Sequence, residues 1–313
     1  MSSINLKCYT SNDNVIWNDF VKNSKNGIFM LNRNYMDYHS DRFKDNSLMF
    51  YDDNNLIALL PANIKDNALY SHGGLTFGGF ITNENMKQHK MNSCFECLIN
   101  YCKQNDIKKI IYKCIPQIYH KLPADEDLYS LFLNNAQLIK IEPSTTILLG
   151  AQCKMPKGRT AQISRAKREG ILIEKSDKFS DFIKLENEVL QEYHNTKAVH
   201  TAEELELLYS RFPENIQLWV AKYNDEIIAA TLLFVSDQTV HTQYLAANKK
   251  AREIGGLDLL INTLLEKFSN SKKYFDFGIS TENNGKILNE GLISQKEGFG
   301  GRTTIYTTFS LKF

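Results

Sequence analysis

Apolar residues in the first half of the chain recur at spacings that predict helices followed by strands. Ile16, Trp17, Phe20 and Val21 repeat at the period of a helix, and the polar residues at 11–14 can cap its first turn. We expect a strand at 4–9, this helix, a short helix at 34–43, strands at 47–51, 56–64 and 68–71, a glycine-rich loop at 72–79, a longer helix and a strand at 109–113.

The second half of the chain repeats this order. We expect helices at 180–194 and 201–210, strands at 216–223, 226–235 and 239–246, a loop containing Gly255 and Gly256, a helix at 257–268 and a strand at 274–277. Thr201 and Glu204 have the spacing of a capping box at the start of the second of these helices. The repeated order predicts a duplicated α/β domain, with one copy at 1–150 and the other at 151–313.

Composition narrows the class of protein. Apolar residues make up 42% of the 313, which is enough for two cores, and 37 basic residues against 36 acidic ones leave a formal charge of +1. A general nucleic-acid binder would carry a basic excess, so we expect no nucleic-acid partner. The start of the sequence does not resemble an export signal, and no apolar run reaches the ~20 residues of a membrane span. We therefore expect a cytoplasmic protein.

The cysteines raise the question of a metal. Cys94 and Cys97 have the spacing of a metal knuckle, but no second pair lies at a matching distance. Met91, Cys94 and Phe95 begin a helical apolar stripe that continues to Cys102. We expect buried thiols on a helix and no metal.

Two segments could bind anions. The stretch 157–168 is rich in Lys and Arg; as a helix, it would either present an ordinary solvated face or line a phosphate site, and the pattern does not separate the two. The junction 244–257 joins a strand to a helix through basic residues and glycines. The start of a helix has free N–H groups and a favourable dipole, so this junction either cradles a pyrophosphate or is an ordinary connector.

Motifs in the second half resemble the GNAT superfamily of acetyltransferases. The stretch 252–257 (Arg-Glu-Ile-Gly-Gly-Leu) is similar to the superfamily's coenzyme A phosphate loop, with Leu257 where Gly or Ala is usual. The stretch 292–299 is similar to its helix-to-strand step, with Ile293 at the usual Tyr position.

Further stretches at 71–79, 159–170, 275–278 and 296–301 resemble the tandem-GNAT group, which includes the Fem peptidoglycan aminoacyltransferases and relatives in surface-polysaccharide gene clusters. The resemblance covers nearly the whole chain. It implies two tandem GNAT-like domains, each with a mixed, bent sheet flanked by helices, and acyl-CoA as co-substrate without a metal.

The resemblance also implies where the ligands bind. The backbone of 241–246 would contact the acyl-pantetheine arm, and we expect the acceptor between the domains. The residues expected to bind acyl-CoA are Ala246, Lys249, Arg252, Gly255 and Gly256. The residues expected to bind phosphates of the acceptor are Arg159, Arg165, Lys167 and Arg168.

Acylation of an amine also needs a proton acceptor. The candidates are His72, His200, His241, Asp276 and Glu297. His241 lies within a strand and His200 before a helix, so packing explains both of them. His72 lies in a glycine-rich loop and Asp276 at a strand end, and these two, with Tyr244 as a residue that could stack on the substrate, are the predicted catalytic residues.

The predicted function is N-acylation of a nucleotide-linked amino sugar, such as a dTDP-amino-deoxyhexose, in surface-polysaccharide biosynthesis. One alternative is a Fem-type transferase that moves an aminoacyl group from tRNA to a peptidoglycan precursor. Another is a binding scaffold that keeps the fold without catalysis.

Overall fold

The computed structural model describes residues 4–151, 153–194 and 197–313, which divide into two compact units. The first unit contains 1–142 and 305–313, and the second contains 143–304. The last nine residues belong with the first unit, whereas the sequence pattern assigns them to the second half of the chain. Two strands, β8 (Gln137–Leu148) and β16 (Arg302–Lys312), run across the two boundaries. Each unit is described separately below.

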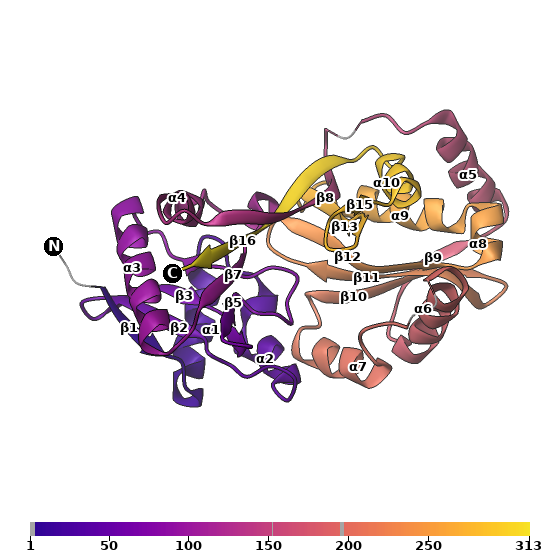
Figure 1. Cartoon of the computed structure of the whole chain (residues 1–313). Coiled ribbons are helices and arrows are strands. Elements are labelled where there is room, and N and C mark those ends of the chain that lie inside the picture. Colours follow the sequence, from indigo (N-terminus) through magenta and orange to yellow (C-terminus); the bar gives the residue numbers. More distant parts are fainter. Residues whose placement is uncertain (1–3, 152, 195–196) are drawn as a thin grey trace. The chain divides into compact units, whose positions relative to one another are not determined.

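The first unit contains two sets of strands, four α-helices and short 3₁₀ helices among its described residues (Figure 1). Its elements are β1 (Ile4–Cys8), α1 (Asn14–Asn23), α2 (Arg33–Met36), β2 (Leu48–Asp52), β3 (Asn55–Leu60), β4 (Asn63–Lys65), β5 (Ala68–Tyr70), β6 (Ile81–Thr82), α3 (Gln88–Gln104), β7 (Lys109–Lys113) and α4 (Glu126–Leu133). One sheet has the order β1-β2-β3-β6, and β4-β5-β7-β16 form the other set. β5 and β7 are parallel and are joined through α3.

The second unit is built on one mixed sheet with helices on both faces. Its elements are α5 (Lys157–Arg168), β9 (Leu172–Ser176), α6 (Phe179–His194), α7 (Ala202–Arg211), β10 (Ile216–Tyr223), β11 (Glu226–Val235), β12 (Thr239–Ala247), α8 (Lys249–Ile254), α9 (Gly256–Phe268), β13 (Tyr274–Ile279), β14 (Thr281–Glu282), β15 (Ile287–Leu288) and α10 (Glu290–Glu297). The strand order is β8-β13-β12-β11-β10-β9, and β12 and β13 are its parallel pair. The expected α/β class, with mixed sheets flanked by helices, is confirmed.

Both units therefore contain a strand, a helix and a parallel strand in sequence. β12-α9-β13 in the second unit corresponds to β5-α3-β7 in the first. A parallel pair needs such a crossover, because its two strands run in the same direction. The two units share this part of the predicted order, whereas the three-strand meander predicted in both halves is divided between two sheets in the first unit.

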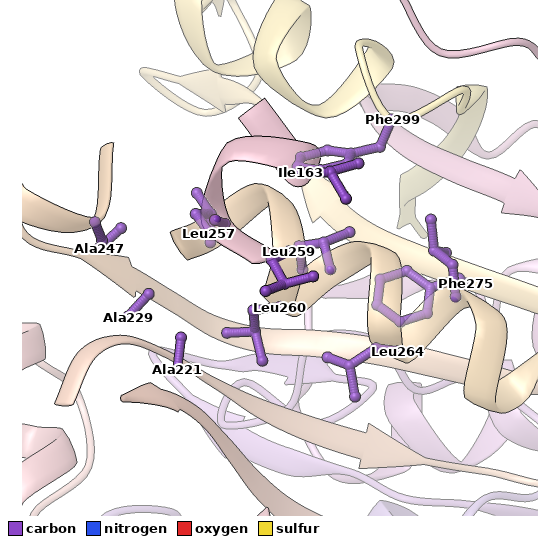
Figure 2. Close-up of a cluster of buried hydrophobic side chains, with 14 of the residues drawn as sticks. Ile163, Ala221, Ala229, Ala247, Leu257, Leu259, Leu260, Leu264, Phe275 and Phe299 are labelled. Carbon is purple, nitrogen blue, oxygen red and sulfur yellow. The ribbon is translucent and has the colours of Figure 1, made fainter. Parts of the chain in front are cut away.

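The core of the second unit lies between α9 and one face of the sheet (Figure 2). Leu260 and Leu264 on α9 are fully buried, as is Phe275 on β13. Burial of one such side chain stabilises the fold by about 1.5–3 kcal/mol. The helical stripe expected at 257–268 is this packing surface.

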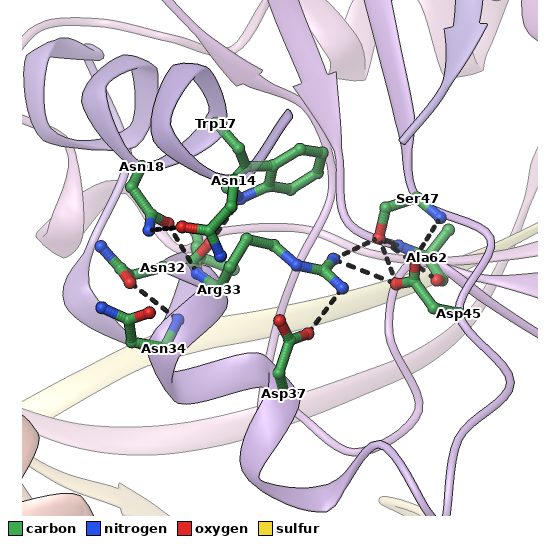
Figure 3. Close-up of polar contacts among 11 residues, drawn as sticks. Asn14, Trp17, Asn18, Asn32, Arg33, Asn34, Asp37, Asp45, Ser47 and Ala62 are labelled. Carbon is green, nitrogen blue, oxygen red and sulfur yellow. Dashed lines mark hydrogen bonds and ion pairs between the residues drawn. The ribbon is translucent and has the colours of Figure 1, made fainter. Parts of the chain in front are cut away.

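In the first unit a buried arginine replaces apolar packing at the start of α2 (Figure 3). Arg33 donates to Asp45 and Ser47, each at 3.1 Å, and to Asp37 at 2.6 Å. Its guanidinium also lies 3.9 Å from the centre of the Tyr9 ring. A buried charge is tolerated only when it is paired and hydrogen-bonded, and these contacts supply both.

Some expected elements differ from the structure. The strand predicted at 56–64 is two strands in different sheets, β3 and β4, because Pro61 between them cannot donate to a ladder. The helix predicted at 34–43 ends its α-helical part at Met36. In α1 only Trp17 and Val21 are buried, whereas Ile16 is 51% exposed, so the predicted inner face was too wide.

Cysteines on α3 are packed as predicted. Cys94 and Cys102 are fully buried, and burial raises the pKa of both thiols, so they stay protonated. Within the described ranges, none of the helices combines the length and apolar character that a membrane span requires.

Candidate active site at the separation of two parallel strands

The second unit's two parallel strands pair over a short stretch and then separate. β12 and β13 pair at Thr239 with Tyr274, Val240 with Phe275, and His241 with Asp276, which is the last pair recorded between these two fully described strands. β12 continues along β11 as far as Ala247. The edge of β12 that would face β13 therefore has backbone groups beyond His241 that β13 does not pair with. Such an edge can bind an extended ligand through its N–H and C=O groups.

A bulge in β12 decides which side chains share a face of the sheet. Leu233 pairs with Thr242 and Leu232 with Tyr244, so Gln243 is an extra residue on β12. In a regular strand, residues three apart point to opposite faces, and the extra residue reverses this. His241 and Tyr244 therefore lie on the same face.

The apolar core shows which face this is. Val240 and Ala247, seven residues apart across the bulge, both belong to the core beneath α9. Phe275 and Phe277 of β13 belong to the same core, which leaves Asp276 on the opposite face. The sheet thus has an apolar face under α9 and a face with titratable side chains.

On that second face, His241 and Asp276 form a hydrogen-bonded pair at the point of separation. His241 Nδ1 lies 2.8 Å from Asp276 Oδ2, and the carboxylate also accepts bonds from Ser144 Oγ at 2.5 Å and Thr146 Oγ1 at 2.8 Å. Asp276 is fully buried, while the His241 side chain keeps 11% exposure. A carboxylate that holds Nδ1–H fixes the tautomer in which Nε2 can accept a proton.

Gly278 makes room for the imidazole ring. It has a φ of +74°, in the left-handed region, and a Cβ at this position would lie 3.1 Å from His241 Cε1. A side chain here would strain the backbone and press on the ring. Gly278, two residues after Asp276, therefore leaves space for the ring of His241.

A buried lysine lies at the end of β13. Lys296 on α10 donates from Nζ to the carbonyl oxygens of Gly278 at 3.0 Å and Ile279 at 2.7 Å, and the residue is 6% exposed. Burial lowers the pKa of Lys296 to about 8, while the charge of Asp276 opposes that shift. Lys296 thus interacts electrostatically with Asp276, and a cation in such a place can stabilise negative charge that develops on an oxygen.

Tyr244 makes a second polar pair on the same face. Its hydroxyl lies 2.6 Å from His200 Nδ1, and its ring packs against Phe182 of α6 at 6.0 Å between centroids. His200 is buried and precedes α7, which begins with the predicted capping box of Thr201 and Glu204. The predicted catalytic residues Tyr244 and Asp276 thus lie on one face of the second unit's sheet.

The predicted phosphate loop has a different structure from the one expected. Its first part is the short helix α8, which is capped by the side chain of Asn248, and Gly255 separates α8 from α9 with a φ of +81°. A Cβ on Gly255 would lie 2.3 Å from the backbone oxygen of Gln162, so the glycine allows α5 to approach closely. Gly256, the first residue of α9, is buried.

The other residues predicted to bind acyl-CoA lie around this turn. Ala246 is buried in β12 and pairs with Ala230 of β11. Lys249 and Arg252 lie on α8 and are exposed. The close approach of α5 explains the glycine without a ligand, whereas the two cations remain accessible.

Two arginines predicted to bind acceptor phosphates have partners inside the second unit. Arg159 pairs with Asp258, donates to the carbonyl of Gln295 at 3.0 Å, and stacks over Phe299 at 3.7 Å. Arg165 donates to the carbonyl of Glu253 at 2.8 Å. These contacts attach α5 to its neighbours.

The other two residues predicted to bind acceptor phosphates are Lys167 and Arg168. Lys167 and Arg168 lie at the end of α5 and are exposed. An exposed cation is available to an anionic ligand. Arg165 is exposed as well, but its guanidinium already bonds to Glu253.

His72 belongs to the first unit. Its φ is +64°, the residue is 3% exposed, and the centre of its ring lies 5.4 Å from the ring centres of both His39 and Phe43. Burial, followed by nearby positive charges, lowers the pKa of His72 to about 3. Such an imidazole is a weak base at neutral pH, and its surroundings are those of a packed ring.

Sequence reasoning did not give Lys296, Ser144 and Thr146 a role in this site. Lys296 lies in the motif at 296–301, on the last turn of α10, and could have been identified as a charged residue directly before a glycine-rich stretch. Ser144 and Thr146 lie more than 120 residues before Asp276 and carry no local signal. Glu297, another candidate base, has no direct contact with the His-Asp pair among the interactions described above.

Residues 159–284 match the family model "Acetyltransferase (GNAT) domain", which spans most of the second unit. A search of curated protein sequences finds no match. The fold is similar to the crystal structure of FemX, with a TM-score of 0.69 at 11% identity over 99% of this chain and 97% of that one.

Two other solved structures share the fold. The C-terminal domain of a putative lysylphosphatidylglycerol synthetase from Agrobacterium fabrum has a TM-score of 0.64 at 12% identity, covering 96% of this chain and 92% of that one. A tandem GNAT protein from the clavulanic acid biosynthesis pathway has a TM-score of 0.54 at 10% identity, covering 99% and 98%. The chain thus contains a GNAT acetyltransferase domain within its second unit, and the protein is an acyltransferase of the GNAT fold.

Proposed function

We propose that the protein transfers an acyl group to an amine at the point where β12 and β13 separate. The observation that carries this proposal is the His241–Asp276 pair at the last paired position of the two strands, beside an unpaired edge of β12. An extended thioester bound along that edge would bring its carbonyl to the imidazole. Proximity of this kind supplies much of the rate of a two-substrate reaction.

The proposed reaction uses each of these groups once. The amine nitrogen attacks the thioester carbonyl, and His241 Nε2 takes a proton from that nitrogen while Asp276 stabilises the resulting imidazolium. Lys296 favours the negative charge on the carbonyl oxygen. The carbon–sulfur bond then breaks, the thiolate takes up the proton, and the products are the amide and the free thiol.

The proposed donor is acyl-CoA. Lys249 and Arg252 on α8 are exposed cations at the end of β12, and their charge suits the phosphates of coenzyme A. Because α5 fills the space at Gly255, we assign the phosphate contacts to these side chains and to the backbone at Gly256. Ala246 would contact the pantetheine arm through its backbone.

The proposed acceptor is the amine of a nucleotide-linked amino sugar, such as a dTDP-amino-deoxyhexose in surface-polysaccharide biosynthesis. Its diphosphate needs a second set of cations, and Lys167 and Arg168 are exposed cations near the end of α5. Arg159 and Arg165 are held by partners within the unit and would act by positioning the helix.

The experiment is a screen of acyl-CoAs against dTDP-amino-deoxyhexoses, following release of free thiol and confirming the amide by mass spectrometry. The matched controls are the same nucleotide sugars with hydroxyl in place of amine. We expect thiol release only with the amines, and reduced activity in Arg252→Ala through a higher KM for acyl-CoA. Equal thiol release with both kinds of sugar would exclude N-acylation.

A second candidate is transfer of an aminoacyl group from tRNA. It is favoured by the packing of Gln162 against Gly255, which occupies the place where a pyrophosphate would approach the backbone. The fold is also consistent with this candidate, because the structure of FemX is similar to that of this chain, with a TM-score of 0.69. Aminoacyl-tRNA that supports amide formation where no acyl-CoA does would replace the first candidate with this one.

A further inference from the structure

A buried carboxyl group lies on the sheet-facing side of α6. Glu186 is 6% exposed, and its Oε2 atom has no hydrogen-bond partner among the backbone and side-chain atoms that the structure describes. Burial raises the pKa of Glu186 to about 7, with no neighbouring charge contributing to the shift. Burying a carboxyl group without a cation lowers the stability of the fold. A ligand that supplies the missing partner would explain why such a group is present.

Helix geometry places Glu186 next to the polar face of the sheet. α6 packs against β11 and β12, and Phe182, one turn before Glu186, contacts the ring of Tyr244. Residues four apart on a helix lie on the same side, with Cβ atoms about 6 Å apart. Glu186 is therefore adjacent to the side of the helix that covers Tyr244.

The segment at 197–200, which leads to α7, lies near both α6 and Tyr244. Ala198 donates its backbone N–H to Asn187 Oδ1 at 2.9 Å, which brings the segment at 197–200 back beside the residue that follows Glu186. Two residues later, His200 bonds to the hydroxyl of Tyr244. Glu186 thus lies on a helix that packs against β12, and the segment leading to α7 returns to both of these elements.

We infer that Glu186 binds the amino group of the acceptor and holds it beside Tyr244 and His200. This inference rests on the proposed function and names the group of the acceptor that is recognised. An ammonium ion would supply both a charge and the donor that Oε2 lacks, and it would lose one proton to solvent before the neutral amine attacks the thioester. Acyl-CoA has no cationic group near its thioester, so under the first candidate function the acceptor is the ligand that fits a carboxylate.

The steady-state test compares Glu186→Gln with the matched variant Glu188→Gln, an exposed residue of the same helix. Loss of a charged hydrogen bond predicts a rise of about 10- to 100-fold in KM for the amine in Glu186→Gln. We expect KM for the acyl donor to be unchanged, and Glu188→Gln to behave as wild type. A rise confined to the donor's KM, or none, overturns the inference.

A second measurement needs no acyl transfer, so its result is independent of the proposed reaction. The carbon-13 NMR signal of the Glu186 carboxyl group, assigned by its absence in Glu186→Gln, is titrated with pH in butylammonium chloride and in tetramethylammonium chloride at equal ionic strength. We expect a lower titration midpoint in butylammonium, which has N–H donors, and no change in tetramethylammonium, which has none. Equal midpoints in both salts overturn the inference even if the protein acylates amines.

Discussion

The two faces of the second unit's sheet use the same strands for different purposes. Toward α9, β13 contributes Phe275 and Phe277 to a continuous apolar core. Toward the other face, the same strand contributes Asp276, which is fully buried and accepts bonds from His241 and two hydroxyl groups. Alternation along a strand thus lets one face carry stability and the other carry chemistry.

This difference between the two faces predicts which substitutions should change stability alone and which should also change activity. Apolar burial is roughly additive over area, so a truncation under α9 should cost stability alone. A buried carboxylate with several hydrogen bonds is a connected network, so its loss should affect both. The predictions below test this division, beginning with the largest effect.

Asp276→Asn should have the largest effect, because it removes the charge that orients His241 and places an amide among three donors. We expect kcat to fall by about 10²- to 10⁴-fold and the free energy of unfolding to fall by about 1–3 kcal/mol. Kinetics and urea unfolding measure the two effects. Asp177→Asn, an exposed aspartate of the same unit, is the control and should change neither. Full activity in Asp276→Asn would contradict its assigned role.

Leu260→Ala tests the apolar face. Removal of this fully buried side chain should lower the free energy of unfolding by about 2–5 kcal/mol, because it leaves a cavity under α9. Activity per folded molecule should stay within about twofold of wild type if the faces are separable. Leu207→Ala, at a position that is 42% exposed, is the stability control. A kcat loss as large as that of Asp276→Asn would break the division between the faces.

Lys296→Met should reduce kcat by about 10- to 100-fold, because the site loses the cation that favours a negatively charged oxygen. The pKa of Lys296 is lowered to about 8, so its ammonium form is lost as pH rises through that value. The wild-type rate should therefore decline above about pH 8, and the variant should lack that decline. Lys286→Met, at an exposed position, should keep the wild-type profile. Identical profiles in Lys296→Met and wild type would exclude a role for the charge.

Thr201→Ala should have the smallest effect of the four. The Thr201 hydroxyl accepts from the backbone N–H of Glu204 at 3.2 Å, and the Glu204 carboxylate accepts from the backbone N–H of Thr201 at 3.0 Å. Loss of the cap should lower the free energy of unfolding by about 1 kcal/mol, and Thr201→Ser should restore it. Urea unfolding of the three proteins is the measurement. No difference between Ala and Ser would mean that the cap is not stabilising.

Much of the second unit could be predicted from local patterns. The strands at 216–223 and 226–235 were predicted to the residue, and Asn224 and Asp225 between them adopt the positive φ of a hairpin turn. The capping box at Thr201 was predicted from two residues three apart. Such features depend on neighbours in sequence, so the sequence alone reveals them.

Features that depend on distant segments were missed. The segment at 249–254 was expected to be a loop and is the helix α8. Gly255 after it accommodates α5, which lies nearly 100 residues earlier in the sequence. The bulge at Gln243 reverses the face of Tyr244, and no turn residue marks it. His241 was considered as a base and set aside as a packed residue, because its partner Asp276 is brought to it only by the parallel register.

The most direct test of the account is the rate of amide formation by His241→Ala at saturating acyl donor and amine, with circular dichroism to verify the fold. The account predicts a kcat at least about 10²-fold below wild type, because the proton acceptor is missing. Added imidazole should restore part of that rate, and His89→Ala, in the first unit, should equal wild type. A His241→Ala rate within about threefold of wild type, unaffected by imidazole, would contradict the placement of the active site at the separation of β12 and β13.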